Sequence, residues 1–574
     1  MGLWRFICHC LYSYLDLATP MGNLKFARPQ MGNAIILKKM KLKFIKKIIV
    51  MSGILSIQGS LLYGFYYNEN LIFNFKTAYL EQIYFPVYAY SLNDTKNNVT
   101  NNLANVSAIF GRNNFNETVS AGNQQSELAA KSIPVLLYHG IIDKPDGANI
   151  LLENFKDQMF ALKKAGWQTI SIEDFYAFTR GEKQVPDKSF LLTFDDGRKD
   201  SYYPVDPILK ALDYYAVMFV ITGRSLGKET EMSPFHLSEK ELRRMAKSGR
   251  WEIQSHGKND HDFYKINANG NEGHFLSNKL WLDNENRLET EEEFTSRINS
   301  DFISAKSGIE KELGAKVISF AFPFGDFGQN SVNFPEAEPI ILDAAKSIYS
   351  MAFYQVWPGR GFYFNYPDKN QFLIKRIDVK PDWTADNLLQ ILDTGREKTL
   401  PFTDDFNDYN GWIRTWGELS FAGNSLILSS RASTTGSSAF LGGTYLWQDY
   451  VFKSKIDLVK GQTFFLLARY TNDKNYVWCS FSPTHIKIGR MINGSSRVLV
   501  ERKGNFESIG KDREFGIGVY DDAVSCYVDD KIAVKLYDGL HKNLRQGGIG
   551  FKTWDPQANN SELIIKKISV EEIK

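Results

Sequence analysis

Two short clusters in the middle of the chain contain residue types that bind metal ions and move protons. Asp195 and Asp196 are adjacent, and His256 and His261 are separated by four residues. One carboxylate and two imidazoles provide nitrogen and oxygen ligands with open positions for water and substrate, a common catalytic metal arrangement. The second carboxylate can then act as a base toward water. Each cluster alone is weak evidence for a catalytic site, because Asp-Asp-Gly is usually only a turn and two histidines five positions apart are usually unrelated.

Both clusters directly follow predicted strands. Seven apolar runs are typical of buried strands: Val135–Tyr138, Phe190–Phe194, Ala216–Ile221, Trp251–Gln254, Val317–Phe322, Met351–Val356 and Leu373–Asp378. Helical patterns lie between most of them, among them Phe155–Ala165; the clearest is Glu291–Leu313, opened by a capping box of Thr290 and Glu293. This alternation predicts a parallel sheet covered on both faces, either open or closed into a barrel. In a barrel the chemistry lies at the C-terminal ends of strands, where both clusters fall.

Four longer motifs contain or accompany these side chains. They are Leu192-Thr193-Phe194-Asp195-Asp196-Gly197, Ser255-His256 with His261, Ala321-Phe322-Pro323-Phe324-Gly325-Asp326, and Lys375-Arg376-Ile377-Asp378, preceded by Tyr138-His139-Gly140. Together they resemble the four motifs of the polysaccharide deacetylases of carbohydrate esterase family 4. The resemblance covers about residues 131–395 and implies an irregular (β/α) barrel. We therefore expect a deacetylase domain at 131–398.

The resemblance implies a role for each side chain of the two clusters. Asp195 would be the general base. The metal ligands would be Asp196, His256 and His261. A divalent ion, for which zinc is our expectation, would polarise the acetamide carbonyl and lower the pKa of its bound water.

Two further residues take their expected roles from the same resemblance. Arg376 resembles the arginine that pairs with the base carboxylate, and such pairing would lower the pKa of Asp195. An ordinary surface or interdomain ion pair is the other interpretation of Arg376. A backbone N–H near Phe324 would help the metal to hold the tetrahedral oxyanion.

The chain departs from the family pattern in its general acid. The family usually supplies a histidine late in the domain, whereas this chain has none between His274 and His485. Asp195 could return the proton itself, or metal-bound water or His139 could assist. His274 lies in an insertion, Tyr264–Thr290, which we expect to form a loop over the site, with His274 as a solvated loop residue.

The spacing of the two histidines indicates a branch of the family. Many members have three residues between them, and the four found here look like the branch that acts on exopolysaccharides such as poly-β-1,6-N-acetylglucosamine. We expect hydrolysis of acetamide groups in a GlcNAc-containing cell-surface polysaccharide, with release of acetate. Two rival interpretations are a catalytically weak or inactive glycan-binding surface protein and a metal amidohydrolase acting on small molecules.

From about Phe402 the pattern changes to short strand-like runs between Gly, Asn and Asp turns. The predicted strands are Ser425–Ser429, Phe464–Tyr470, Tyr476–Phe481, Phe515–Tyr520, Val524–Val528 and Leu563–Val570. They predict an all-β sandwich over 402–574, which resembles lectin-type jelly rolls and is expected to bind carbohydrate. Five tryptophans could stack on sugars or fill the core: Trp412, Trp416, Trp447, Trp478 and Trp554. Cys479 and Cys526 fall on predicted strands, and the sequence leaves their pairing open.

The N-terminal part is predicted to contain a membrane-targeting segment followed by a spacer. Residues 1–47 end in a cluster of six lysines, and residues 48–67 carry no charge. Twenty helical residues reach about 30 Å, enough for a membrane anchor, while a cleaved signal peptide is the alternative. The lysines predict that the rest of the chain lies outside the cytoplasm, anchored to the cell envelope or secreted after cleavage. Residues 68–130 are expected to be an Asn-rich spacer, and residues 1–39 could be an over-extended start.

The composition excludes some classes of protein. Lys+Arg 68 against Asp+Glu 66 gives a net charge of +2, which argues against a whole-chain binder of nucleic acid. Four cysteines in 574 residues exclude a disulfide-dense scaffold. Aromatic residues make up 14% of the chain, which suits both sugar-binding surfaces and large β-sheet cores.

Overall fold

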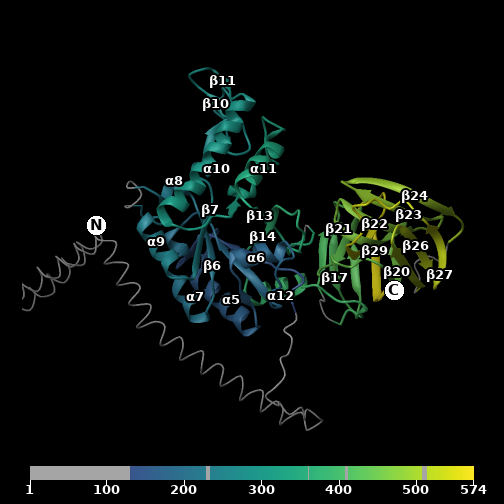
Figure 1. The fold of residues 1–574 in the computed structure, drawn as a ribbon. Coiled ribbons are helices and arrows are strands. Elements are labelled where there is room, and N and C mark those ends of the chain that lie inside the picture. The colour runs from purple at the N-terminus through teal and green to yellow at the C-terminus, as the bar shows by residue number, and fades with distance from the viewer. Residues whose placement is uncertain (1–128, 228–232, 360, 408–410, 507–512, 574) are drawn as a thin grey trace, which may run out of the picture. The chain divides into compact units, whose positions relative to one another are not determined.

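The computed structural model describes residues 129–574 except 228–232, 360, 408–410, 507–512 and 574 (Figure 1). The predicted basic segment 1–47, the predicted anchor 48–67 and almost all of the predicted spacer 68–130 lie outside the described residues. Within the described part of the chain, no helix combines the length and the apolar character needed to cross a bilayer.

A closed parallel barrel forms the first described domain. Its strands are β1 (Val135–Tyr138), β5 (Ser189–Phe194), β6 (Ala216–Val220), β7 (Trp251–Ser255), β12 (Ser319–Ala321), β13 (Met351–Val356) and β14 (Leu373–Asp378). They pair in the order β1-β14-β13-β12-β7-β6-β5, and β1 also pairs with β5, so the sheet closes on itself. The short β4 (Gln168–Thr169) is an additional strand that pairs in parallel with β5. The predicted alternatives, open sheet or barrel, are thus resolved in favour of the barrel.

The barrel strands are continuous apolar runs because both of their faces are covered. All residues of β1, β5, β6 and β12 are buried. Inside the barrel, Val135, Leu191, Val217 and Phe353 belong to one hydrophobic cluster. The strands β13 and β14 coincide with the predicted ranges, and the other barrel strands differ from them by a few residues at most.

Helices surround the strands (Figure 1). They are α5 (Leu152–Lys164), α6 (Ile172–Thr179), α7 (Asp206–Leu212), α8 (Thr222–Ser225), α9 (Glu239–Lys247), α10 (Glu291–Leu313), α11 (Ala337–Ile348) and α12 (Ala385–Gly395). The capping box predicted for α10 is confirmed, with reciprocal bonds between Thr290 and Glu293. Its C-terminus is Gly314 in the left-handed conformation, which glycine adopts without a steric cost.

Two small hairpins replace the loop predicted between β7 and α10. The first joins β8 (Phe263–Lys265) to β9 (Glu272–His274), and the second joins β10 (Trp281–Leu282) to β11 (Arg287–Leu288). Arg297 of α10 holds this insertion by donating to the carbonyl oxygens of Phe275 and Asn278 and to the carboxylate of Glu289. The insertion is therefore an ordered element fastened to the barrel.

The second described domain is an antiparallel sandwich. One sheet contains β17 (Glu418–Phe421), β18 (Leu426–Ser429), β29 (Glu562–Glu572), β20 (Tyr450–Lys460), β25 (Arg513–Tyr520), β26 (Ala523–Val528) and β27 (Lys531–Leu536), with β15 (Phe402–Asp404) paired to β29. The other contains β16 (Trp412–Trp416), β19 (Gly436–Leu441), β28 (Gly548–Trp554), β21 (Thr463–Asn472), β22 (Asn475–Phe481), β23 (His485–Ile492) and β24 (Ser495–Lys503). The all-β sandwich expected for 402–574 is what the structure shows.

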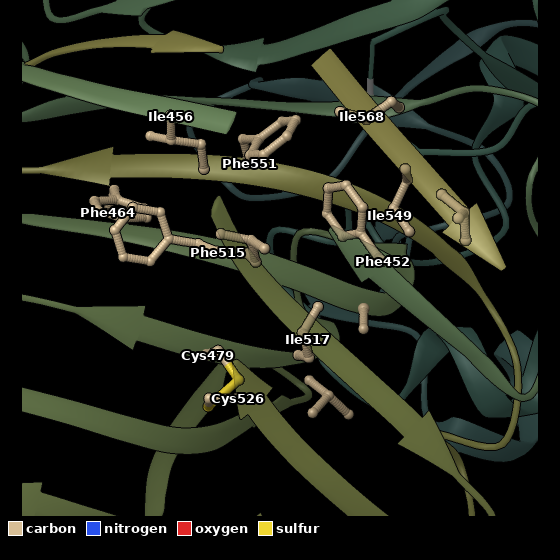
Figure 2. Packing of buried hydrophobic residues seen from close by; sticks show 14 of the residues in the cluster. Phe452, Ile456, Phe464, Cys479, Phe515, Ile517, Cys526, Ile549, Phe551 and Ile568 are labelled. Atoms are coloured by element: carbon tan, nitrogen blue, oxygen red, sulfur yellow. A yellow bond between two sulfur atoms is a disulfide. The ribbon is translucent and has the colours of Figure 1, made fainter. Parts of the chain in front are cut away.

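The two sheets enclose one apolar core, to which Phe464, Phe515, Phe551 and the Cys479–Cys526 disulfide belong (Figure 2). The cysteine pairing that the sequence left open is thus present, and it ties β22 of one sheet to β26 of the other. Trp412 and Trp447 belong to this core. The structure therefore assigns these two tryptophans to packing.

The other three tryptophans lie outside that core cluster. Trp478 is buried, Trp416 is half-buried and Trp554 is exposed. Only the last two keep the exposed surface that stacking on a sugar requires.

Candidate active site

Asp195 lies at the C-terminal end of β5 and is almost completely buried, with 1% of its surface exposed. Arg376 of β14 reaches it across the barrel, with Nη1 2.6 Å from Oδ1 and Nη2 2.7 Å from Oδ2. Burial alone would raise the pKa of Asp195, but the charge and hydrogen bonds of Arg376 outweigh it and hold this pKa below its usual value. The rival interpretation of Arg376, an ordinary surface or interdomain pair, is wrong because its side chain is fully buried on Asp195.

Asp196 turns away from Asp195 because the backbone bends sharply after β5. Its φ is +70°, and Gly197 follows with φ +64°. Oδ1 of Asp196 is buried and accepts no hydrogen bond, although two imidazole nitrogens lie nearby. A buried carboxylate oxygen without a donor is costly unless a cation compensates it, so this atom points to a ligand.

His256 follows β7, and a backbone carbonyl fixes its ring. Nδ1 lies 2.7 Å from the carbonyl oxygen of Ala321 on β12, which acts as the acceptor of the Nδ1–H bond. The lone pair of Nε2 is then free to ligate a metal, and Nε2 lies 3.5 Å from Oδ1 of Asp196. Neighbouring strands of the barrel thus set both the position and the tautomer of this residue.

His261 is carried by a tight loop that α10 holds in place. Both carboxylate oxygens of Asp301 accept backbone N–H bonds from the loop, at 2.8 Å from Lys258 and 2.9 Å from Asn259. Gly257 has φ +76°, and a Cβ there would lie 1.9 Å from Oδ2 of Asp260, so only glycine fits. The loop presents Nε2 of His261 3.1 Å from Oδ1 of Asp196.

Three potential ligand atoms therefore converge on one point. One oxygen of Asp196 and one nitrogen each of His256 and His261 lie within 4.8 Å of one another. Despite burial, the two imidazoles lower the pKa of Asp196 well below its usual value, and Asp196 in turn raises the pKa of His261. An N,N,O donor set with open positions suits zinc and other first-row divalent metals. The described residues fit a catalytic metal ion.

His139 is a further histidine of this region, and the sequence assigned it no defined role beyond assistance in proton transfer. It follows β1, whose last residue, Tyr138, pairs with Phe194 directly before Asp195. The backbone of His139 is therefore next to that of Asp195, whose N–H donates to the carbonyl oxygen of Tyr138. The charge of His139 is a minor cause among those that lower the pKa of Asp195 and Asp196. The Oγ of Ser201 donates to the carbonyl oxygen of His139 and fixes its backbone.

Phe324 lies in a short 3-10 turn, Pro323–Gly325, directly after β12, and has φ +59°. Such a conformation is strained for a bulky residue and is typical of functional turns. The Phe324 ring packs against His261, with 4.6 Å between ring centroids. The backbone N–H of Phe324 is thus on a turn that abuts the ligand set, as the oxyanion role requires.

His274 corrects one expectation. It is not a solvated loop histidine, because Nδ1 lies 2.5 Å from Oδ2 of the buried Asp326 and the ring stacks on Phe324 at 4.4 Å and 10°. The carboxylate of Asp326 is itself ordered by the backbone N–H of Gly328, and its pKa is lowered below the usual value although burial opposes this. The hairpin β8–β9 thus brings a histidine to the outer side of Phe324.

Sequence reasoning missed the two carboxylates that support the site. Asp301 is the single buried acid on the otherwise apolar face of α10, and that break in the pattern was a readable signal. Asp326 is the last residue of the motif Ala321–Asp326, but its partner His274 lies 52 residues earlier, and no local pattern connects them.

Comparison with known proteins gives this barrel its class. Residues 182–336 match the family model described as polysaccharide deacetylase. That segment contains the base, the three candidate ligands and the Phe324 turn, whereas Arg376 lies beyond it. The closed parallel barrel with this site is accordingly a polysaccharide deacetylase domain.

Two of the relatives that the chain resembles have the same enzyme name. The chain is 27% identical over 180 residues to the poly-beta-1,6-N-acetyl-D-glucosamine N-deacetylase of Escherichia coli, covering 30% of this chain and 27% of that protein. It is 26% identical over 245 residues to the enzyme of that name from Staphylococcus aureus, covering 42% and 72%. The chain thus spans about a quarter of the first relative. A de-N-acetylase structure from Aggregatibacter actinomycetemcomitans matches with 22% identity and a TM-score of 0.38, covering 45% of this chain and 98% of that one.

Proposed function

We propose that this protein hydrolyses acetamide groups of a GlcNAc-containing polysaccharide and releases acetate. The observation that carries the proposal is the pairing of a fully buried Asp195–Arg376 ion pair with three convergent ligand atoms at one end of the barrel. An ionised carboxylate beside a metal site can deprotonate a water molecule so that it attacks an amide carbonyl. Poly-β-1,6-N-acetylglucosamine is the proposed polymer, supported by the names of the two curated relatives.

Asp196, His256 and His261 would hold the metal, for which we propose zinc. A bound divalent ion would supply Lewis-acid polarisation of the carbonyl and a lower pKa for water. Asp195 accepts the proton of the attacking water, and Arg376 keeps it ionised for that purpose. The N–H of Phe324 donates to the oxygen on which negative charge develops.

His139 is the proposed proton donor to the leaving amine. It directly follows β1, which pairs with β5, so its backbone lies next to that of Asp195. Asp195 takes a proton from the attacking water, and the leaving amine needs a proton from a donor. With His139 as donor, one residue accepts the proton of water and another protonates the amine. This arrangement supplies the general acid that the family pattern places later in the chain.

We also propose that the protein works outside the cytoplasm, held at the cell envelope by residues 48–67 or secreted. The Cys479–Cys526 disulfide favours an oxidising compartment, because such bonds are rare in the cytosol. A large immobile substrate would explain why a sandwich with half-buried and exposed tryptophans follows the barrel, and we propose that this sandwich binds glycan.

Acetate release from poly-β-1,6-N-acetylglucosamine, chitooligosaccharides and peptidoglycan is the direct test, measured with added zinc and again after EDTA. We expect metal-dependent release that is largest on the first polymer. Release unaffected by EDTA would contradict the metal site, and no release from any GlcNAc polymer would contradict the enzyme and favour a glycan-binding protein. Equal rates on monomeric and polymeric acetamides would favour a small-molecule amidohydrolase.

Two variants divide the roles within the site. Asp195→Asn should retain bound metal and lose turnover, because the residue is a base and not a ligand. His256→Ala should lose both metal and turnover, since it removes one of three ligands. Metal content is measured by elemental analysis of the purified protein. Full metal content in His256→Ala would refute the ligand assignment.

A further inference from the structure

Three aromatic rings extend outward from the metal ligands along the β8–β9 hairpin. Phe324 packs on the ligand His261, and His274 and Phe263 both pack on Phe324, at centroid distances of 4.4 and 5.5 Å. Phe263 also contacts His274 at 5.1 Å, so the three rings touch one another. They form a single aromatic surface that begins at the candidate metal centre.

Exposure is largest at Phe263. The side chains of His261 and His274 are 20% and 26% exposed, whereas the whole residues Phe324 and Phe263 are 36% and 54% exposed. A large apolar ring that is half exposed loses hydrophobic stabilisation, and such rings beside a catalytic centre mark surfaces that a ligand covers. Phe263 is the ring with the most surface left to cover.

The hairpin fixes the position of these rings. Phe263 and His274 are directly opposite each other in the antiparallel pair β8–β9. Asp326 anchors the far end, because its buried carboxylate accepts the Nδ1–H of His274. A residue with a Cβ at Gly273 would press on Asn278, whose amide donates to the carbonyl oxygen of His274. The rings are thus held before a ligand arrives, which reduces the entropy lost on binding.

The chemistry of the surface suits a sugar ring. Aromatic faces pack against the apolar C–H face of a pyranose, while its hydroxyl and acetamide groups need hydrogen-bond partners. His274 supplies such a partner, because its Nδ1–H is directed to Asp326 and its Nε2 lies at the opposite edge of the ring. An apolar peptide would use the rings but not this polar edge.

We propose that Phe263, His274 and Phe324 form a subsite for the sugar next to the one whose acetamide is cleaved. The proposal rests on the proposed function and deepens it, since it makes the enzyme selective for a polymer over a single sugar. Phe263 packs against the C–H face of that neighbouring sugar, and Nε2 of His274 hydrogen-bonds to one of its polar groups. Phe324 joins the subsite to the reaction centre.

Rates on β-1,6-linked N-acetylglucosamine oligomers of one to five residues test the subsite. In the wild-type full-length protein, kcat/KM should rise with length. Phe263→Ala and His274→Ala should each lower kcat/KM for the pentamer at least tenfold and leave the value for the monomer unchanged. Phe263→Tyr keeps the ring and should behave as wild type. A loss that is equal for monomer and pentamer would overturn the proposal.

Tyr215→Ala is the matched control. Tyr215 is 42% exposed and precedes β6, so it lies at the opposite, N-terminal end of the barrel. Removal of its ring should leave the length dependence unchanged. A similar loss of pentamer activity in this variant would show that any exposed ring has the same effect, and the subsite would be rejected.

A binding measurement separates failure of the subsite from failure of the proposed function. Calorimetric titration of the pentamer into Asp195→Asn, with and without the added Phe263→Ala substitution, reports the subsite without turnover. If no acetate is released but the pentamer binds and Phe263→Ala weakens binding at least fivefold, the subsite stands and the hydrolase does not. If acetate is released and the added Phe263→Ala substitution leaves binding of the pentamer unchanged, the subsite is wrong and the hydrolase stands.

Discussion

Asp195 and Arg376 form a bidentate pair, in which Nη1 of Arg376 donates to Oδ1 of Asp195 and Nη2 donates to Oδ2. Neither side chain is exposed to solvent by more than 1%. A bidentate pair of this kind fixes the orientation of the carboxylate as well as its charge. The residue proposed as the base is therefore presented ionised and immobile.

Arg376→Met should raise the pKa of Asp195, because burial then acts without its opposing charge. In the wild type the lowered pKa keeps the base ionised at neutral pH, and activity is lost as the pH falls through that pKa. In the variant the acid limb of kcat/KM should move to higher pH, and activity at pH 7 should fall by about 100-fold, a typical contribution of one general base. An acid limb at the wild-type position would contradict this role of Arg376.

The same variant should cost about 3–5 kcal/mol of stability, because it leaves a buried charge unpaired. The pair stabilises the fold above the pKa of an unfolded aspartate, about 3.9, and this contribution is lost as the pH falls through the folded pKa. Arg180→Met is the control, since Arg180 pairs with Glu182 at the surface and its loss should destabilise the fold far less. Urea unfolding of the two variants at pH 7 measures the difference.

Gly257→Ala should disable the metal site although it removes no ligand. The new Cβ would lie 1.9 Å from Oδ2 of Asp260, and the positive φ is strained for alanine, so the loop that carries His261 has to move. We expect at least a tenfold loss of zinc affinity, measured by competition with a chelating dye.

Gly249→Ala is the matched control for that loop. Gly249 also has a positive φ, +72°, but nothing lies within 4 Å of the position a Cβ would take. The Gly249→Ala variant should lose only about 1 kcal/mol of stability, through backbone strain, and should keep its affinity for zinc. Equal zinc affinities in the two variants would show that the steric contact at Gly257 is unimportant.

The sequence predicted the barrel well because fully buried parallel strands are uninterrupted apolar runs. The ranges of β1, β13 and β14 agree with the predicted ones, and the ends of β5 and β7 carry the proposed base and ligands, as predicted. The strand β19, Gly436–Leu441, was missed because its Gly-Ser-Ser start has a low preference for strands, and only packing between two neighbours buries it. Local pattern cannot report such tertiary effects.

The outer part of the site was not predictable for a related reason. The bond between His274 and Asp326 joins residues far apart in sequence, and the hairpin that creates it has short strands with no clear alternation. Arg376 could be assigned to Asp195 only through the family resemblance, since the two residues are 181 positions apart. Motifs identify chemistry, whereas the supporting contacts come from the fold.

Replacing Cys479 and Cys526 together by alanine should destabilise the sandwich. The disulfide closes a loop of 47 residues, and loss of this constraint on the unfolded chain costs about 4 kcal/mol in the loop-entropy estimate. We expect a lower thermal midpoint for the sandwich and an unchanged kcat on a short oligomer, because the reacting groups lie in the barrel. Calorimetry of the full-length protein, with and without a reductant, measures the first effect. A wild-type midpoint insensitive to reduction would show that the bond adds no stability.

His139→Phe should lower kcat by about 100-fold or more and leave KM and bound zinc nearly unchanged, because a general acid acts in the transition state and not in substrate binding. His236→Phe is the control, since His236 is also partly buried and senses the charge of Asp196, while its own pKa is lowered to about 4 chiefly by burial. A group with that pKa carries no proton to donate at neutral pH, so its loss should not affect the chemical step. Steady-state rates at pH 7 on poly-β-1,6-N-acetylglucosamine distinguish the two histidines, and equal losses of kcat would remove His139 from the mechanism.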